Sequence, residues 1–396
     1  MLDLAADDKP PFEFNSKIFD DAAAMVYDAG GFDLSQIKDP RAKKMAEETL
    51  RIIMRAVDEG IPHEVPEELR YALEENSFVF SGFKTYHTLR DIGLSMVDDK
   101  GNVKPFDAFK EDVKKVNQRY NVNYLYAEYK HAVGASLMAV KWRDLAERPD
   151  RYFLQYRTAG DSKVRETHRR LDGVTLPATD AFWDKYYPPN GWGCRCQVVK
   201  VRRSKFPSTD PKQAMKDGDE MTDDIKQRIF RYNAGKDLKL FPPKHPFYKA
   251  PAAAKKTINE INEEKKKEQT AKRRKEIRAY MADHLNDQLK NPDFSKTVTM
   301  SGGTVKEFLN QPHVHYMEKN ELLMDIKKIF KKAKYLGINP TYEKKGLKYS
   351  HIFEIEIIGD KSWLLVREYT DGRCFLYSCS DNKKIATGLQ KNKDPE

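Results

Sequence analysis

The stretch YYPPNGWGCRCQVVKV, residues 186–201, carries the strongest structural signals in this 396-residue chain. Its Pro-Pro-Asn-Gly run predicts a rigid turn, because proline fixes φ and glycine adopts conformations that other residues avoid. Residues 194–201 predict a β-strand. Residues two apart on a strand point to the same face, so we expect the thiols of Cys194 and Cys196 to converge. The sequence thus predicts a compact, loop-rich Cys-Arg-Cys module over residues 151–205.

The segment upstream of this stretch supplies further polar residues. Residues 151–160 predict a strand that runs into a turn, and the polar run DSKVRETHRRLD follows at 161–172. Thiolate and imidazole ligands favour zinc, and a closed structural site needs four ligands. We therefore expect one structural zinc held by Asp161, His168, Cys194 and Cys196. Asp161 is the candidate fourth ligand because it opens the segment that carries His168.

Two other interpretations of these residues stay open. The cysteines can be small buried residues, with His168 on the surface, or the zinc can be catalytic rather than structural. A disulfide framework is excluded, because four cysteines in 396 residues are too few.

Composition limits the class of protein. The 20 phenylalanines and 20 tyrosines exclude a fully disordered chain. No apolar run approaches the roughly 20 residues of a membrane span, and the start MLDLAADDKPPFEF lacks the features of a signal peptide. We expect a soluble protein, made in the cytoplasm, with no membrane partner.

Charge is unevenly distributed along the chain. Residues 1–150 contain 21 Lys and Arg against 28 Asp and Glu, whereas residues 151–396 contain 50 against 33. A phosphate-rich partner is therefore electrostatically plausible for the second part.

Hydrophobic periodicity predicts a multidomain α+β protein. Residues 1–150 form a helical region, with helices expected at 38–59, 66–76, 107–118 and 124–148. Residues 206–295 form an irregular connector followed by a charged helical linker, whose helix covers 255–290. We expect that helix to be a solvated linker rather than a nucleic-acid-binding element.

The last part, residues 296–396, predicts an α+β domain. A helix is expected at 318–336, followed by strands at 351–358, 362–369 and 373–380. The Asp371-Gly372 pair is a strong signal for a hairpin, so the sheet is expected to be antiparallel.

The motifs around the cysteines resemble a known family. The runs Arg165-Glu-Thr-His-Arg-Arg-Leu-Asp-Gly, Phe182-Trp183 and Tyr187-Pro-Pro-Asn-Gly-Trp-Gly-Cys-Arg-Cys are similar to those of the head morphogenesis, or minor head protein, family of Mu-like tailed phages. The resemblance covers about residues 10–205 and is dense over 151–201. Many relatives have Cys-x-x-Cys where this chain has Arg165 and His168, which leaves the fourth ligand open.

The resemblance implies a component of a phage or prophage head that acts in capsid assembly or in DNA packaging and delivery. Portal and capsid proteins are the implied protein partners. The implied location is the host cytoplasm during assembly and then the virion head.

Residues with possible catalytic chemistry gather in the last predicted domain. Metal-independent cleavage of RNA needs a general base, a general acid and a cation for the phosphorane charge. His351 is our candidate acid and base, and Arg367 is the candidate phosphate clamp. The supporting candidates are Lys348, Tyr369 and Ser378.

This arrangement resembles phage nuclease domains of the barnase, EndoU, colicin and RelE class, over about residues 296–390. The resemblance implies a metal-independent endoribonuclease, a toxin-like effector domain with RNA as substrate. The alternative is a non-catalytic module that binds the portal or packaged DNA, in which case the whole protein is structural.

Overall fold

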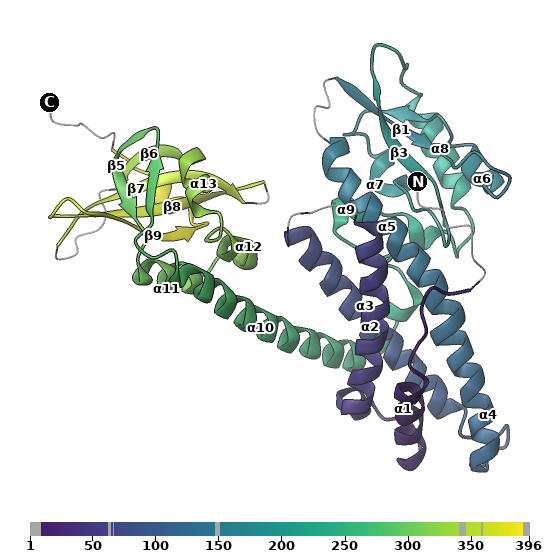
Figure 1. The fold of residues 1–396 in the computed structure, drawn as a ribbon. Coiled ribbons are helices and arrows are strands. Elements are labelled where there is room, and N and C mark those ends of the chain that lie inside the picture. The colour runs from purple at the N-terminus through teal and green to yellow at the C-terminus, as the bar shows by residue number, and fades with distance from the viewer. Residues whose placement is uncertain are drawn as a thin grey trace. The chain divides into compact units, whose positions relative to one another are not determined.

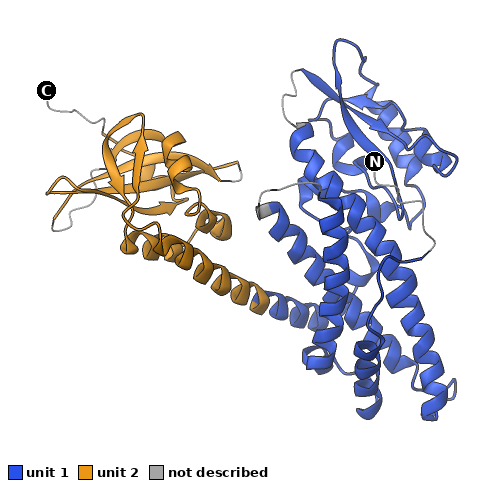
Figure 2. Ribbon diagram, viewed as in Figure 1, with its two compact units in different colours: residues 1–263 blue, residues 264–396 orange. Residues whose placement is uncertain are grey.

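The structure is a computed structural model that describes residues 9–61, 65, 67–146, 151–339, 346–357 and 359–390. The chain divides into two compact units, residues 1–263 and 264–396 (Figures 1 and 2). Helix α10 (Ala252–Ala282) has 31 residues and includes the point of division. Among the described helices, none has the length and apolar character that crossing a membrane requires.

A helical bundle forms most of the first unit, as the sequence predicts. Its elements are α1 (Ser16–Asp28), the 3-10 helix η1 (Leu34–Lys38), α2 (Pro40–Gly60), α3 (Glu67–Leu94), α4 (Phe106–Asn117), the π-helical segment η2 (Gln118–Tyr124) and α5 (Leu125–Ala146). Helix α2 begins at Pro40, two residues after the expected start, because the Asp39 side chain accepts a hydrogen bond from the Arg41 N–H and Pro40 occupies the first turn. The predicted helix at 124–148 is α5, and residues 147 and 148 lie outside the described residues.

The predicted helix at 66–76 is too short. Helix α3 continues to Leu94, and Pro66 lies outside the described residues. Between Phe80 and Leu89 nearly every side chain of α3 is buried. A helix that is buried all round has no apolar stripe, so its hydrophobic period is weak.

Charged side chains are buried inside this bundle. Lys84 on α3 forms an ion pair with Glu128 on α5, and the two side chains are only 1% and 3% exposed. Both charged groups are shielded from water, so each needs the other's charge to offset the free-energy cost of its dehydration.

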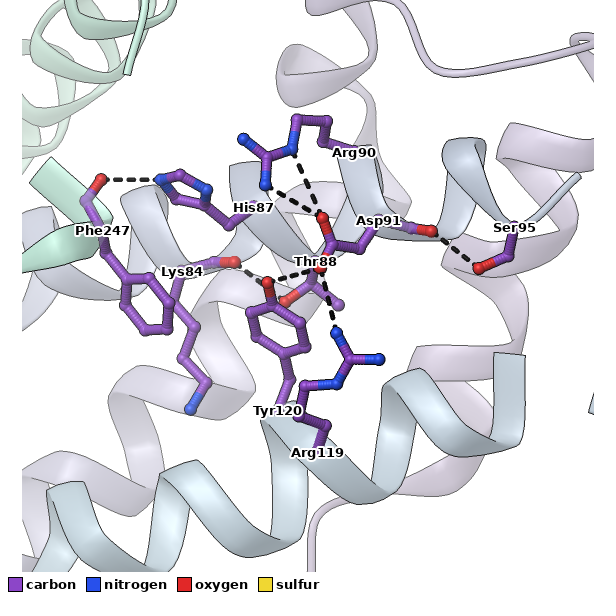
Figure 3. Close-up of polar contacts among 9 residues, drawn as sticks. All are labelled: Lys84, His87, Thr88, Arg90, Asp91, Ser95, Arg119, Tyr120 and Phe247. Atoms are coloured by element: carbon purple, nitrogen blue, oxygen red, sulfur yellow. Dashed lines mark hydrogen bonds and ion pairs between the residues drawn. The ribbon is translucent and has the colours of Figure 1, made fainter. Parts of the chain in front are cut away.

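A polar network on the same helix ties down neighbouring segments (Figure 3). The Asp91 carboxylate accepts hydrogen bonds from Arg90 and, at 2.8 Å, from the Tyr120 hydroxyl of η2. His87 Nε2 lies 2.9 Å from the carbonyl oxygen of Phe247. Helix α3 therefore holds both the π-helical segment and a segment about 160 residues further along the chain.

The connector after residue 205 is part of the first unit's core. It contains α8 (Pro211–Met221), η3 (Arg228–Phe230), α9 (Ala234–Asp237) and η4 (Pro246–Tyr248). Phe241 stacks on Phe80 of α3 with ring centroids 3.7 Å apart, and Phe230 and Phe247 join the same buried cluster. We expected an irregular backbone here, whereas Pro211–Met221 form a regular helix, and the aromatic packing was not predicted.

The second unit is a six-stranded curled sheet with short helices. Its elements are β4 (Gln288–Asn291), β5 (Phe294–Thr299), α11 (Gly302–Asn310), α12 (Tyr316–Glu321), α13 (Ile326–Lys332), β6 (Lys334–Asn339), β7 (Leu347–Ile357), β8 (Asp360–Tyr369), β9 (Cys374–Ser380) and η5 (Lys383–Ala386). The strand order is β4-β5-β9-β8-β7-β6. The three predicted strands are confirmed as β7, β8 and β9, apart from Ile358, which lies outside the described residues.

Two expectations for this unit are wrong. The sheet is mixed rather than antiparallel, because β5 and β9 pair in parallel. The helix expected at 318–336 is broken into α12, α13 and the start of β6. Asn291 explains where α13 ends, since its side-chain amide donates 2.7 Å hydrogen bonds to the carbonyl oxygens of Phe330 and Ala333 and caps the helix there.

Candidate metal centre

A three-stranded antiparallel sheet supports the candidate site. It is built from β1 (Tyr152–Arg157), β2 (Thr175–Leu176) and β3 (Gln197–Arg202), in the order β2-β1-β3. The short helix α6 (Glu166–Arg169) carries His168, and α7 (Phe182–Tyr186) precedes the turn that leads to the cysteines.

The cysteines do not lie in a strand, contrary to our expectation. Strand β3 begins at Gln197, directly after them, so alternation along a strand does not explain why they converge. They lie in a turn in which the Cys194 N–H donates to the Gly191 carbonyl at 3.1 Å. Gly193 has a φ of +68°, the left-handed region that glycine enters without strain.

The structure brings His168, Cys194 and Cys196 together. The Nδ1 atom of His168 is 3.7 Å from the Cys194 sulfur and 3.5 Å from the Cys196 sulfur. The three side chains are nearly inaccessible to solvent, with exposures of 3%, 7% and 8%. Their potential ligand atoms all lie within 4.8 Å of one another.

These distances fit a tetrahedral zinc ion. Zinc–sulfur bonds of about 2.3 Å and zinc–nitrogen bonds of about 2.05 Å, at a tetrahedral angle, place sulfur and nitrogen about 3.6 Å apart. The two observed sulfur–nitrogen distances lie on either side of that value. The donor set of two thiols and one imidazole also matches zinc.

Asp161, our candidate fourth ligand, is engaged elsewhere. Its carboxylate forms a bidentate pair with Arg195, at 2.5 and 2.7 Å. Hydrogen bonds from Arg195 lower the pKa of Asp161 to about 2, so the carboxylate is stable as the partner of this guanidinium. The structure thus brings together three of the four predicted ligands.

Neighbouring groups favour the thiolate form of Cys194, whereas the hydrogen bond with Cys194, together with burial, raises the pKa of Cys196. Hydrogen bonds from Cys196 and His168 hold the pKa of Cys194 well below its ordinary value, although burial opposes them. The Tyr156 hydroxyl is hydrogen-bonded to Cys196 and to the Asn190 side chain. A deprotonated sulfur is the form that binds a metal.

The predicted ribonuclease residues lie on two faces of the second unit's sheet. His351 is completely buried, and its Nε2 and Nδ1 atoms lie 2.9 Å from the Glu368 carboxylate and 2.9 Å from the Tyr335 hydroxyl. Burial lowers the pKa of His351, and Glu368 opposes that shift. Lys348 lies on this side, 3.6 Å from Glu368.

The other candidates lie on the opposite face. Arg367 follows Val366, the cross-strand partner of His351, so its side chain points away from the histidine. It stacks over the Tyr377 ring. Tyr369 is two residues along the same strand, and Ser378 is buried opposite Leu365.

Sequence reasoning missed the residues that surround His351. Glu368 is 1% exposed and accepts a 2.8 Å hydrogen bond from Lys296 of β5. The sequence places Glu368 next to Arg367 on a predicted strand, which is the one indication it gives. Only the pairing register of β7 and β8 shows that Glu368 contacts His351.

Comparison with known proteins bears on both units. Residues 104–199, which include all three clustered side chains, match the family described as Phage Mu protein F like protein. This region is similar to that family.

Two curated relatives are similar to part of the chain. The putative capsid assembly protein F of Escherichia phage Mu is 30% identical over 112 residues, which is 28% of this chain and 23% of that protein. The Mu-like prophage FluMu F protein of Haemophilus influenzae is 33% identical over 93 residues, 22% of each chain. The chain therefore spans less than a quarter of either relative's length. No solved structure matches the chain.

The second unit matches a different family. Residues 268–377 match large polyvalent protein-associated domain 3, a description that names no activity. This match covers His351, Arg367, Lys348 and Tyr369 but ends before Ser378.

Proposed function

We propose that this chain is a phage or prophage head-assembly protein whose Mu F-like region is held together by one structural zinc ion. The observation that carries the proposal is the buried cluster of His168, Cys194 and Cys196 inside residues 104–199, the region that matches the Phage Mu protein F like family. Capsid and portal proteins are the proposed partners, and the virion head is the proposed destination, after assembly in the host cytoplasm.

The burial of the three side chains favours a structural over a catalytic metal, and the fourth ligand of such a closed site is not assigned among the described residues. All three ligand side chains are buried, whereas a catalytic zinc needs a ligand position that substrate can reach. When bound, zinc would supply coordination bonds that join α6 to the turn before β3. These bonds would stabilise a module that has few regular elements of its own.

Genetic deletion tests the assembly role. The gene is removed from the phage or prophage genome that carries it, and DNA-filled heads are counted in gradient-purified lysates by electron microscopy. We expect far fewer filled heads, rescue by a plasmid with the intact gene, and poor rescue by Cys194→Ser/Cys196→Ser. Normal numbers of filled heads after deletion would contradict the proposal.

For the second unit, we propose nucleic-acid binding without cleavage, in preference to the ribonuclease hypothesis. A ribonuclease that uses His351 and Arg367 needs both at one substrate phosphate, yet they project from opposite faces of the sheet. The buried His351 also has both ring nitrogens engaged, with Glu368 and Tyr335. The basic balance of residues 296–396, 18 Lys and Arg against 13 Asp and Glu, supports binding.

Incubation of the full chain with labelled RNA separates these hypotheses. We expect the RNA to stay intact while a control ribonuclease degrades it. Cleavage that His351→Ala abolishes would restore the ribonuclease hypothesis and refute ours.

A further inference from the structure

The exposed face of helix α13 carries only lysines. All four exposed residues of this seven-residue helix are lysine, whereas Ile326 and Phe330 are buried against the sheet. The exposed residues are Lys327, Lys328, Lys331 and Lys332. We call them the lysine face. Lysines at i, i+3 and i+4 lie beside one another on a helix, so their charges form one stripe.

These lysines are not needed to hold the helix in place. Lys327 pairs with Asp287 at 2.9 Å, but within the described parts of the chain the other three form no ion pair. Asn291 already caps the carbonyl end of α13. Lys327 and Lys328 occupy the first turn, where the helix dipole disfavours cations, whereas Lys331 and Lys332 occupy the last turn, where it favours them.

The lysine face also weakens its own helix. Lys327 with Lys331, and Lys328 with Lys332, are like charges four residues apart, which repel each other on an isolated helix. A bound polyanion would offset this repulsion, because each lysine would be attracted to its phosphates.

We infer that the lysine face binds the phosphate backbone of duplex DNA, independently of sequence. This inference rests on the proposed nucleic-acid binding of the second unit and names the surface and the form of the ligand. Single-stranded nucleic acids are normally bound by aromatic side chains that stack on bases. The exposed face of α13 offers no aromatic ring, only cations that contact phosphates.

Salt-dependent binding tests the inference. A labelled DNA duplex of arbitrary sequence is titrated with the full chain at several salt concentrations, and fluorescence anisotropy gives the slope of log K against log salt. Each phosphate contact contributes about 0.9 to that slope. The variant Lys328→Gln/Lys331→Gln/Lys332→Gln is therefore expected to lose roughly 2 to 3 from it.

Two further variants isolate the lysine face. The matched control, Lys306→Gln/Lys383→Gln/Lys384→Gln, removes three exposed lysines elsewhere in the same unit and is expected to keep the wild-type slope. Arginine in place of the three α13 lysines is expected to keep it as well, because the charge remains.

The possible outcomes are distinct. An unchanged slope in the α13 glutamine variant, or an equal loss in the control, would overturn the inference while leaving nucleic-acid binding intact. A wild-type chain that binds no nucleic acid would overturn both.

Discussion

Replacing Lys84 by methionine tests whether the buried ion pair organises the helical bundle. Lys84 and Glu128 are 1% and 3% exposed, so the substitution leaves a carboxylate that is neither hydrated nor paired. Removal of one partner of a buried pair costs about 3 to 5 kcal/mol, and we expect a loss of this size in the free energy of unfolding of the first unit at neutral pH.

The loss should depend on pH in a defined direction. In the intact pair, burial raises the pKa of Glu128 and the Lys84 charge opposes that rise. Without Lys84 only burial remains, so the folded state binds a proton more tightly than the unfolded state. The folded variant is then penalised as pH rises through the folded pKa of Glu128. Stability should recover as pH falls towards 4.5, the ordinary value for the unfolded carboxyl, by at most about 1.4 kcal/mol per pH unit.

Urea titration measures both quantities. Three of the four tryptophans lie in the first unit, so in a Trp363→Phe background the fluorescence reports that unit alone. The double variant Lys84→Met/Glu128→Leu is the control and should recover most of the loss, because an apolar pair needs no compensation. A loss below about 1 kcal/mol, or a loss that is constant from neutral pH down to 4.5, would refute this reasoning.

Three further substitutions have defined outcomes. Gly193→Ala places a side chain on a residue with left-handed backbone, at a cost of about 1 to 2 kcal/mol, and should weaken zinc binding in a chelator competition. Unchanged affinity for zinc would show that this turn does not position the thiols. Asn291→Ala removes two hydrogen bonds at the end of α13 and should lower the stability of the second unit by about 1 to 3 kcal/mol in thermal unfolding; no change would mean that water replaces the amide. His351→Ala should destabilise the second unit by about 1 to 3 kcal/mol, because Glu368 loses a buried partner, and should leave DNA binding intact; loss of binding without loss of stability would contradict the structural role.

Sequence reasoning worked best where local signals and tertiary structure agree. Helix α2 has an aspartate cap, a proline in its first turn and a clear apolar stripe, and strands β8 and β9 flank an Asp-Gly turn. It was less accurate for α3, because burial on all sides removes the hydrophobic periodicity of the helix. It was also less accurate for the helix expected at 318–336, because α13 ends where the Asn291 side chain, from β4, binds its last carbonyl groups.

In the candidate site too, the features that depend on local sequence were predictable and those that depend on tertiary contacts were not. The residue types and spacing of Cys194 and Cys196 indicated a metal site, and the structure places His168 beside both thiols. The pairing of Asp161 with Arg195 was not predictable, because it depends on how two loops meet. The separation of His351 from Arg367 likewise depends on strand register, which one sequence does not determine.

Metal analysis of the purified full chain tests the central claim most directly. We expect about one zinc per chain in the wild type and in Asp161→Asn, and none in Cys194→Ser/Cys196→Ser, because we propose His168, Cys194 and Cys196 as the protein ligands, while Asp161 pairs with Arg195. A wild-type protein that contains no zinc after purification without chelators, and takes none up, would contradict the account.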